Sequence, residues 1–306
     1  MNPTPSSPAP TAGGWQALRA AMLACVEFLP YIGPPIILAL ILGLFWVVER
    51  FQQPPKIEWN AEYLRGRTLV TLQDHYLELL KAHLIRLDFG ESDPTAKFEG
   101  TDVPKTAETM IGLRRLDNLH LCISDVLHRQ VPGDFIEAGA WRGGATIFMR
   151  AALLAYNERT RNVWVADSFQ GLPKPDSGQF PADSFDVRWT HRELVVTLDE
   201  VKQNFANYGL LDQQVRFLPG WFKDTLPNAP IQQLAILRID GDLYESTFEA
   251  LTYLYPKVSI GGYVIVDDYG GIVPCRKAVD DFRATKRIRE DLKRIDWTGV
   301  FWEKLH

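Results

Sequence analysis

Short apolar runs alternate with amphipathic segments from about residue 60 to the end of the chain. The runs that indicate strands are 133–139, 162–167, 215–220, 234–240 and 263–268. Segments with apolar residues every three or four positions indicate helices at 62–87, 113–130, 144–159 and 246–258. Alternation of this kind is typical of a parallel sheet covered by helices on both faces. The sequence therefore predicts an α/β fold with a doubly wound, mostly parallel sheet.

Charge and cysteine usage exclude several classes of function. The formal net charge is −5, with 23% charged residues, so no basic field indicates a nucleic-acid partner. The three cysteines are scattered, and no pair has the spacing of metal ligands. The six histidines form no His-x-x-x-His pair, which disfavours a histidine zinc site.

The first 60 residues differ in kind from the remainder. Residues 1–27 are a polar N-terminus that begins with a Pro/Ser/Ala-rich, disordered stretch. Residues 28–51 contain 21 consecutive uncharged positions, close to the roughly 20 residues that cross a bilayer core. Three prolines in the first third of this stretch would kink or break a helix. A membrane span, an interfacial or partner-docking helix and a buried core helix are the three open interpretations.

We expect an apolar, membrane-associated helix at 28–51, followed by the main domain at 60–306. More basic residues follow the apolar segment than precede it. By the positive-inside tendency, a spanning segment would place the main domain in the cytoplasm, anchored to the inner face of the membrane.

Acids and glycines follow the predicted strands, at the sheet edge where open parallel sheets bind ligands. Gly139 permits a tight turn, and Glu137 suits a cationic ligand group such as an amine. Asp167 ends the next strand, where an acid commonly accepts hydrogen bonds from ribose hydroxyls, with simple capping as the alternative. Gly220 and Trp221 would line an adenine pocket, unless Trp221 is a core residue. Together these residues predict S-adenosylmethionine as the ligand.

Four aspartates end two further strands. Asp240 follows one predicted strand, and Asp267 and Asp268 end the next. Neighbouring strands of a sheet lie about 5 Å apart, so the three carboxylates would converge. Unpaired, they would repel one another, and a hard divalent cation such as Mg²⁺ or Ca²⁺ would neutralise them. Asp242, two residues beyond Asp240, would act as a proton acceptor.

Five segments occur in a fixed order: TMIGLRRLDNL (109–119), DFIEAGAWRGGAT (134–146), VWVADSFQGLP (163–173), LRIDGDLYESTFEAL (237–251) and GGYVIVDDYG (261–270). Together they resemble the macrocin O-methyltransferase (TylF/MycF-type) family. Members are class I, S-adenosylmethionine-dependent and metal-dependent methyltransferases with a Rossmann-like fold, and they methylate sugar hydroxyls of natural products. The resemblance covers roughly residues 65–285. Residues 1–60 have no counterpart in the family's soluble antibiotic enzymes.

The resemblance also implies site residues. Cofactor contacts would come from Thr109, Met110, Ile111, Glu137, Gly139, Asp167 and Ser168. Mg²⁺ would be bound by Asp240, Asp267 and Asp268. Asp242 would take the hydroxyl proton, with metal-bound Asp240 as the alternative. His191, in a segment that resembles the family's lid only in character, is either a lid residue or a surface histidine. The family also implies a dimer or larger homo-oligomer.

The sequence thus predicts a metal-dependent O-methyltransferase that acts on a sugar or another vicinal diol in a natural product or glycan. Two alternatives remain open. Residues 240–242 form an Asp-x-Asp motif, which a glycosyltransferase would use to hold a metal-bound nucleotide sugar. That activity leaves Glu137 and Asp167 unexplained. A catalytically inactive, membrane-tethered binding module is the other alternative, and the complete set of acids argues against it.

Overall fold

One seven-stranded sheet forms the centre of the fold, in the order β3-β2-β1-β4-β5-β7-β6. The computed structural model describes residues 71–87 and 94–306, all within one compact unit, Trp59–His306. The strands are β1 (Asp134–Ala138), β2 (Val163–Asp167), β3 (Val215–Pro219), β4 (Leu234–Ile239), β5 (Val258–Val266), β6 (Lys293–Arg294) and β7 (Val300–Glu303). The first five pair in parallel, and β7 pairs antiparallel with both β5 and β6.

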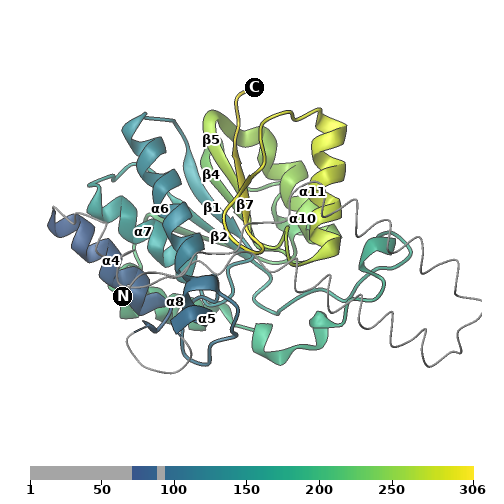
Figure 1. Ribbon diagram of the computed structural model, residues 1–306, viewed down its shortest axis with the longest axis horizontal. Helices are drawn as coiled ribbons and strands as arrows, with labels where there is room; N and C mark the ends of the chain where they lie inside the picture. Colours follow the sequence, from purple (N-terminus) through teal and green to yellow (C-terminus); the bar gives the residue numbers. More distant parts are fainter. Residues whose placement is uncertain (1–70, 88–93) are drawn as a thin grey trace, which may run out of the picture. The chain divides into compact units, whose positions relative to one another are not determined.

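Helices cover both faces of this sheet (Figure 1). They are α4 (Leu72–Leu84), α5 (Pro94–Glu99), α6 (Gly112–His128), α7 (Gly144–Ala155), α8 (Leu198–Asn207), α9 (Phe222–Thr225), α10 (Tyr244–Leu254) and α11 (Val273–Lys286). Figure 1 shows α4, α6 and α7 on one side of the sheet and α10 and α11 on the other. Short 3₁₀ turns lie at η3 (Pro181–Asp183), η4 (Arg188–Thr190), η5 (Arg192–Leu194) and η6 (Tyr255–Lys257).

The two-residue period of the strands divides the core between these two layers. In β1, Phe135 packs in the core that contains α6 and α7, whereas Ile136 packs in the core that contains α10 and α11. In β5, Ile265 and Val264 divide in the same way. Both faces are buried, so the strands read as nearly continuous apolar runs.

The predicted doubly wound, mostly parallel sheet is confirmed. The five predicted strands are present, and β5 begins earlier than its apolar run indicated because it continues back to Val258. Strands β6 and β7 were not predicted from the sequence. Their segments are two and four residues long and carry charged residues, so neither shows a clear strand pattern.

The prediction of a transmembrane helix needs correction. Within residues 71–87 and 94–306, no helix is long and apolar enough to cross a membrane. The longest helix there, α6, carries charged residues such as Arg114, Arg115 and Asp117 along its length. Residues 28–51 lie outside the described residues, so the predicted apolar helix has no structural support. The boundaries 1–27, 28–51 and 60–306 stay predictions.

Gly139 brings the ends of β1 and β4 together. Its φ is +94°, a left-handed conformation that side chains rarely adopt. A Cβ atom there would lie 1.8 Å from the backbone carbonyl oxygen of Asp240. The Asp240 N–H in turn donates to the Ala138 carbonyl at 2.9 Å. The glycine therefore allows the backbone that follows β1 to approach Asp240.

Replacing this glycine should destabilise the fold. We expect Gly139→Ala to lower the free energy of unfolding in urea by more than about 2 kcal/mol, because it combines backbone strain with a backbone clash. Gly209→Ala is the matched control: Gly209 has φ +67°, but nothing lies within 4 Å of its Cβ position. It should cost only about 1 kcal/mol, for the strain alone. Equal losses in the two variants would contradict the proposed close approach.

Candidate active site

A cavity of about 580 Å³ lies at the carboxyl ends of β1, β2, β4 and β5. Its volume is typical of sites that bind small molecules. All the site residues predicted from sequence line it: Thr109, Met110, Ile111, Glu137, Gly139, Asp167, Ser168, His191, Gly220, Trp221, Asp240, Asp242, Asp267 and Asp268. The structure thus brings the predicted residues together, although their individual roles stay predictions.

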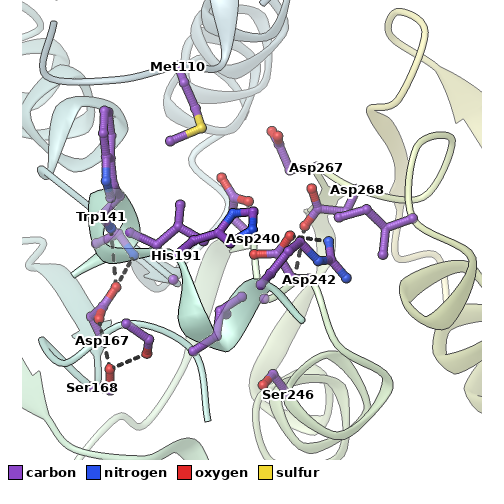
Figure 2. Close-up of a pocket in the computed structure, with 18 of the residues that line it drawn as sticks. Met110, Trp141, Asp167, Ser168, His191, Asp240, Asp242, Ser246, Asp267 and Asp268 are labelled. Atoms are coloured by element: carbon purple, nitrogen blue, oxygen red, sulfur yellow. Dashed lines mark hydrogen bonds and ion pairs between the residues drawn. The ribbon is translucent and has the colours of Figure 1, made fainter. Parts of the chain in front are cut away.

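The two ends of the cavity have different characters (Figure 2). Asp167, Ser168 and Trp141 lie at one end, and the four aspartates at 240, 242, 267 and 268 cluster at the other. His191 lies between these groups. It is exposed, and its Nδ1 atom is 3.5 Å from a carboxylate oxygen of Glu193. His191 is therefore both a surface residue and part of the cavity wall.

Asp167 connects the end of β2 to the loop between β1 and α7. Its Oδ2 atom accepts hydrogen bonds from the backbone N–H groups of Ala140, at 2.8 Å, and Trp141, at 3.2 Å. Its Oδ1 atom accepts from the N–H of Phe169 at 2.7 Å. Burial raises the pKa of Asp167 in spite of these bonds. Asp167 thus accepts a backbone N–H from the turn that follows it, which is the capping alternative considered from the sequence. It also lines the cavity.

Glu137 carries an unsatisfied carboxylate oxygen in the wall of the cavity. It lies directly opposite Arg238 of β4 in the sheet register, and the Arg238 guanidinium donates to its Oε1 atom. Its Oε2 atom is buried and has no hydrogen-bond partner among the described residues. Burial raises the pKa of Glu137 to about 8, with further contributions from Asp240 and Asp267. A buried acceptor without a donor is costly, so this oxygen fits a cationic ligand group.

Asp240, Asp267 and Asp268 form a cluster of oxygen donors. One carboxylate oxygen from each lies within 4.8 Å of the others. Burial, with repulsion from Asp267, raises the pKa of Asp240 to about 6. Burial, with repulsion from Asp240 and Asp242, raises the pKa of Asp268 well above its ordinary value. The protein thus holds these carboxylates where their charges are not fully compensated.

Two buried arginines compensate part of this charge. Arg238 contacts Asp240, at 3.0 Å, and Asp267. Arg115 of α6 contacts the other carboxylate oxygen of Asp267, and its Nε lies 2.9 Å from an oxygen of Asp296. Burial disfavours the charged form of Arg238, but the surrounding carboxylates raise its pKa overall.

Neither arginine was predicted from the sequence. Arg238 had a usable signal: it is the one charged residue within the apolar β4 run, and a buried arginine requires acidic partners. Arg115 had none, because it is one of two adjacent arginines on an amphipathic helix. Only the tertiary structure shows which of the two faces the acids.

The acid cluster fits a divalent cation. The guanidinium groups of Arg115 and Arg238 contact four carboxylates, of Glu137, Asp240, Asp267 and Asp296, and the Asp268 carboxylate completes the aspartate cluster. Two guanidinium charges could not compensate this set if every acid were ionised, and burial together with this repulsion raises the pKa values of Glu137, Asp240 and Asp268. Hard cations such as Mg²⁺ prefer carboxylate oxygens, and the three clustered aspartates supply them.

Asp242 lies beside this cluster in an unusual backbone conformation. Its φ is +59°, and its N–H donates to the Oδ2 atom of Asp268 at 3.1 Å. Its Oδ1 atom accepts a hydrogen bond from Arg188 at 2.6 Å. Burial raises the pKa of Asp242 to about 7, although Arg188 opposes the shift. A carboxylate with a pKa near neutrality suits a general base. Arg188 was also missed, because it lies in a turn-rich segment without a regular pattern.

Removing Arg238 should leave the buried acids without compensation. We expect Arg238→Met to lower the free energy of unfolding, measured in urea with a chelator present, by about 3–5 kcal/mol. Arg216→Met is the matched control because Arg216 is an exposed arginine of β3. It should change stability by less than about 0.5 kcal/mol. Similar small losses in both variants would show that Arg238 does not stabilise the cluster.

Comparisons with known proteins agree with this geometry. A family model described as macrocin-O-methyltransferase (TylF) matches residues 62–304. The chain is 53% identical over 224 residues to demethyldecarbamoylnovobiocin O-methyltransferase of Streptomyces niveus, covering 72% of this chain and 86% of that protein. It is 50% identical over 242 residues to 8-demethyl-8-(2,3-dimethoxy-alpha-L-rhamnosyl)-tetracenomycin-C 4'-O-methyltransferase of Streptomyces olivaceus, covering 75% and 92%.

A solved structure shows the same fold. The O-methyltransferase NovP superposes with a TM-score of 0.75 at 50% sequence identity, covering 76% of this chain and all of that chain. None of these matches supports the glycosyltransferase or the inactive binding module. The predicted family is therefore confirmed: the chain belongs to the macrocin O-methyltransferase (TylF) family, and it is an S-adenosylmethionine-dependent O-methyltransferase.

Proposed function

We propose that this enzyme methylates a sugar hydroxyl of a natural product, with Mg²⁺ bound by Asp240, Asp267 and Asp268. The observation that carries the proposal is that one cavity joins the unsatisfied Glu137 oxygen, the acid cluster and Asp242. The name of the Streptomyces olivaceus relative includes a rhamnosyl group, which supports a sugar as the acceptor. A vicinal diol would suit a site that chelates its acceptor.

The donor would occupy the end of the cavity near Glu137 and Asp167. The unsatisfied oxygen of Glu137 would accept hydrogen bonds from the donor's ammonium group. Asp167 ends β2 and Ser168 follows it, at the position where ribose hydroxyls bind in folds of this type. The Ser168 hydroxyl also donates to the Gly171 carbonyl at 2.7 Å, which fixes the turn beside it.

Further contacts to the donor would come from two loops. The loop that leads into α6 supplies Thr109, Met110 and Ile111. Gly220 and Trp221 follow β3 and would border the adenine. Trp221 is half-buried, so one part of its ring remains available to the cavity.

The acceptor would bind at the acid cluster. When bound, Mg²⁺ would lower the pKa of the acceptor hydroxyl and orient it. Asp242 would take the hydroxyl proton as the acceptor oxygen receives the methyl group. Asp240 is the weaker candidate for the base, because it belongs to the proposed cation-binding set. The chain's main contribution is to align acceptor and donor, since methyl transfer requires an in-line approach.

Metal removal tests the proposal directly. Transfer of labelled methyl groups to a rhamnoside with vicinal hydroxyls should stop when a chelator is added and return with excess Mg²⁺. The corresponding aglycone, which lacks the sugar, should receive no label. Full activity in the chelator would contradict the proposed cation.

The binding role of the acid cluster can be measured without turnover. We expect Asp268→Asn to weaken Mn²⁺ binding in calorimetry by at least about tenfold, because one charged oxygen ligand is lost. Its dissociation constant for S-adenosylmethionine should stay within about twofold of the unmodified enzyme. Asp199→Asn, on the exposed surface of α8, is the charge-matched control and should change neither value. Unchanged Mn²⁺ affinity in Asp268→Asn would place the cation elsewhere.

The choice of base has its own test. Asp242→Asn should lower kcat by about 10²-fold or more, because an amide cannot take the proton. Mn²⁺ and S-adenosylmethionine affinities should remain within about twofold of the unmodified enzyme. Asparagine is the suitable replacement because it tolerates the left-handed backbone at this position. A kcat close to that of the unmodified enzyme would instead favour Asp240.

A further inference from the structure

We propose that Arg188 is a positioning residue that holds residues 181–194 across the acceptor end of the cavity and orients Asp242. The inference rests on the proposed function, in which Asp242 takes the hydroxyl proton. The Nη1 atom of Arg188 lies 2.6 Å from Oδ1 of Asp242, and both side chains are about three-quarters buried, at 23% and 22% exposure. Both residues line the cavity.

The guanidinium of Arg188 is itself held in place. The Asp186 carboxylate accepts from its Nε, at 2.9 Å, and from its Nη2. The other oxygen of Asp186 accepts the backbone N–H of Arg188 at 2.8 Å. One edge of the guanidinium is thus bound within the segment, and the Nη1 edge is directed at Asp242. Both side-chain donors converge on the Oδ2 atom of Asp186, and this charge-assisted contact holds the guanidinium in one orientation.

Residues 181–194 are fixed at both ends. The buried carboxylate of Asp183 accepts the backbone N–H groups of Tyr244, at 2.7 Å, and Glu245, at 3.0 Å. These are the first two residues of α10, whose own N-cap residue has no side-chain hydrogen bond. Near the other end of the segment, the Trp141 indole donates to the carbonyl of Glu193 at 2.8 Å. The segment therefore spans from α10 to the loop at the donor end, and Arg188 lies between these two attachments.

Asp242 receives constraints from two directions. Its backbone N–H bonds Asp268, a proposed cation ligand, and its Oδ1 atom bonds Arg188. Its Oδ2 atom has no partner among the described residues and remains for the acceptor proton. Because Arg188 occupies one oxygen, it selects the other as the acceptor and prevents rotation of the carboxylate. Loss of Arg188 would release both the segment and the base.

Hydrogen exchange of the full-length protein, without acceptor, tests the tie between the segment and Asp242. In Arg188→Gln and in Asp242→Asn, the amides of residues 184–191 should exchange about tenfold faster than in the unmodified protein. The double variant should exchange no faster than Arg188→Gln alone, because Arg188→Gln already breaks the contact with Asp242. Amides of α10 should keep their protection, which excludes global unfolding. Unchanged exchange in Arg188→Gln, or additive effects in the double variant, would overturn the proposal.

Kinetics test the orientation of the base. Arg188→Gln should lower kcat/KM for the acceptor about tenfold to a hundredfold, with S-adenosylmethionine affinity within about twofold. Arg188→Lys should recover only part of the loss, because an ammonium restores the charge but not the planar group that contacts Asp186 and Asp242 from different edges. Arg192→Gln is the matched control, an exposed arginine four residues along, and it should behave as the unmodified enzyme. Full activity in Arg188→Gln would overturn the role of Arg188.

The proposed function and the role of Arg188 can be contradicted independently of each other. An unmodified enzyme that methylates no glycoside would overturn the proposed function, while the exchange comparison would still decide whether Arg188 ties the segment to Asp242. Active enzyme with normal exchange in Arg188→Gln would instead remove only the inference about Arg188.

Discussion

The compensation of buried carboxylates at the ends of β1, β4 and β5 is the interaction on which this site depends. Glu137, Asp240 and Asp267 lie close together because the strands are parallel and in register. Arg238 contacts all three, and Arg115 contacts Asp267 from α6. Without these two guanidinium groups the sheet edge would be strongly destabilised. Even so, carboxyl groups outnumber guanidinium groups in the cluster, which favours positively charged ligands.

The excess of carboxyl groups would favour the binding of both the donor, through its ammonium group, and the proposed metal cation. The unsatisfied oxygen of Glu137 favours a cationic group at the donor end. The three clustered aspartates favour a divalent cation at the acceptor end. Arg238 touches both groups of acids, so it connects the two ends of the cavity. Arg188, which belongs to a segment distant in sequence, forms a comparable ion pair with Asp242.

Much of the fold could be predicted from the sequence, because buried parallel strands leave apolar runs that end in acids. The predicted site residues at these strand ends line one cavity for this reason. The arginines could not be placed in the same way. The partners of Arg115 and Arg188 depend on how α6 and residues 181–194 pack, which periodicity does not report. The short antiparallel strands β6 and β7 left no clear pattern, and the membrane helix predicted from an uncharged stretch found no support.

A crystal structure with S-adenosylmethionine and Mn²⁺ bound would test the central claim most directly, because the anomalous signal identifies the metal. We expect an anomalous peak at ligand distance from carboxylate oxygens of Asp240, Asp267 and Asp268. The donor's ammonium group should lie at Glu137. A fully occupied donor site without metal density at the three aspartates, with Asp240 and Asp267 still paired only to the arginines, would contradict the central claim.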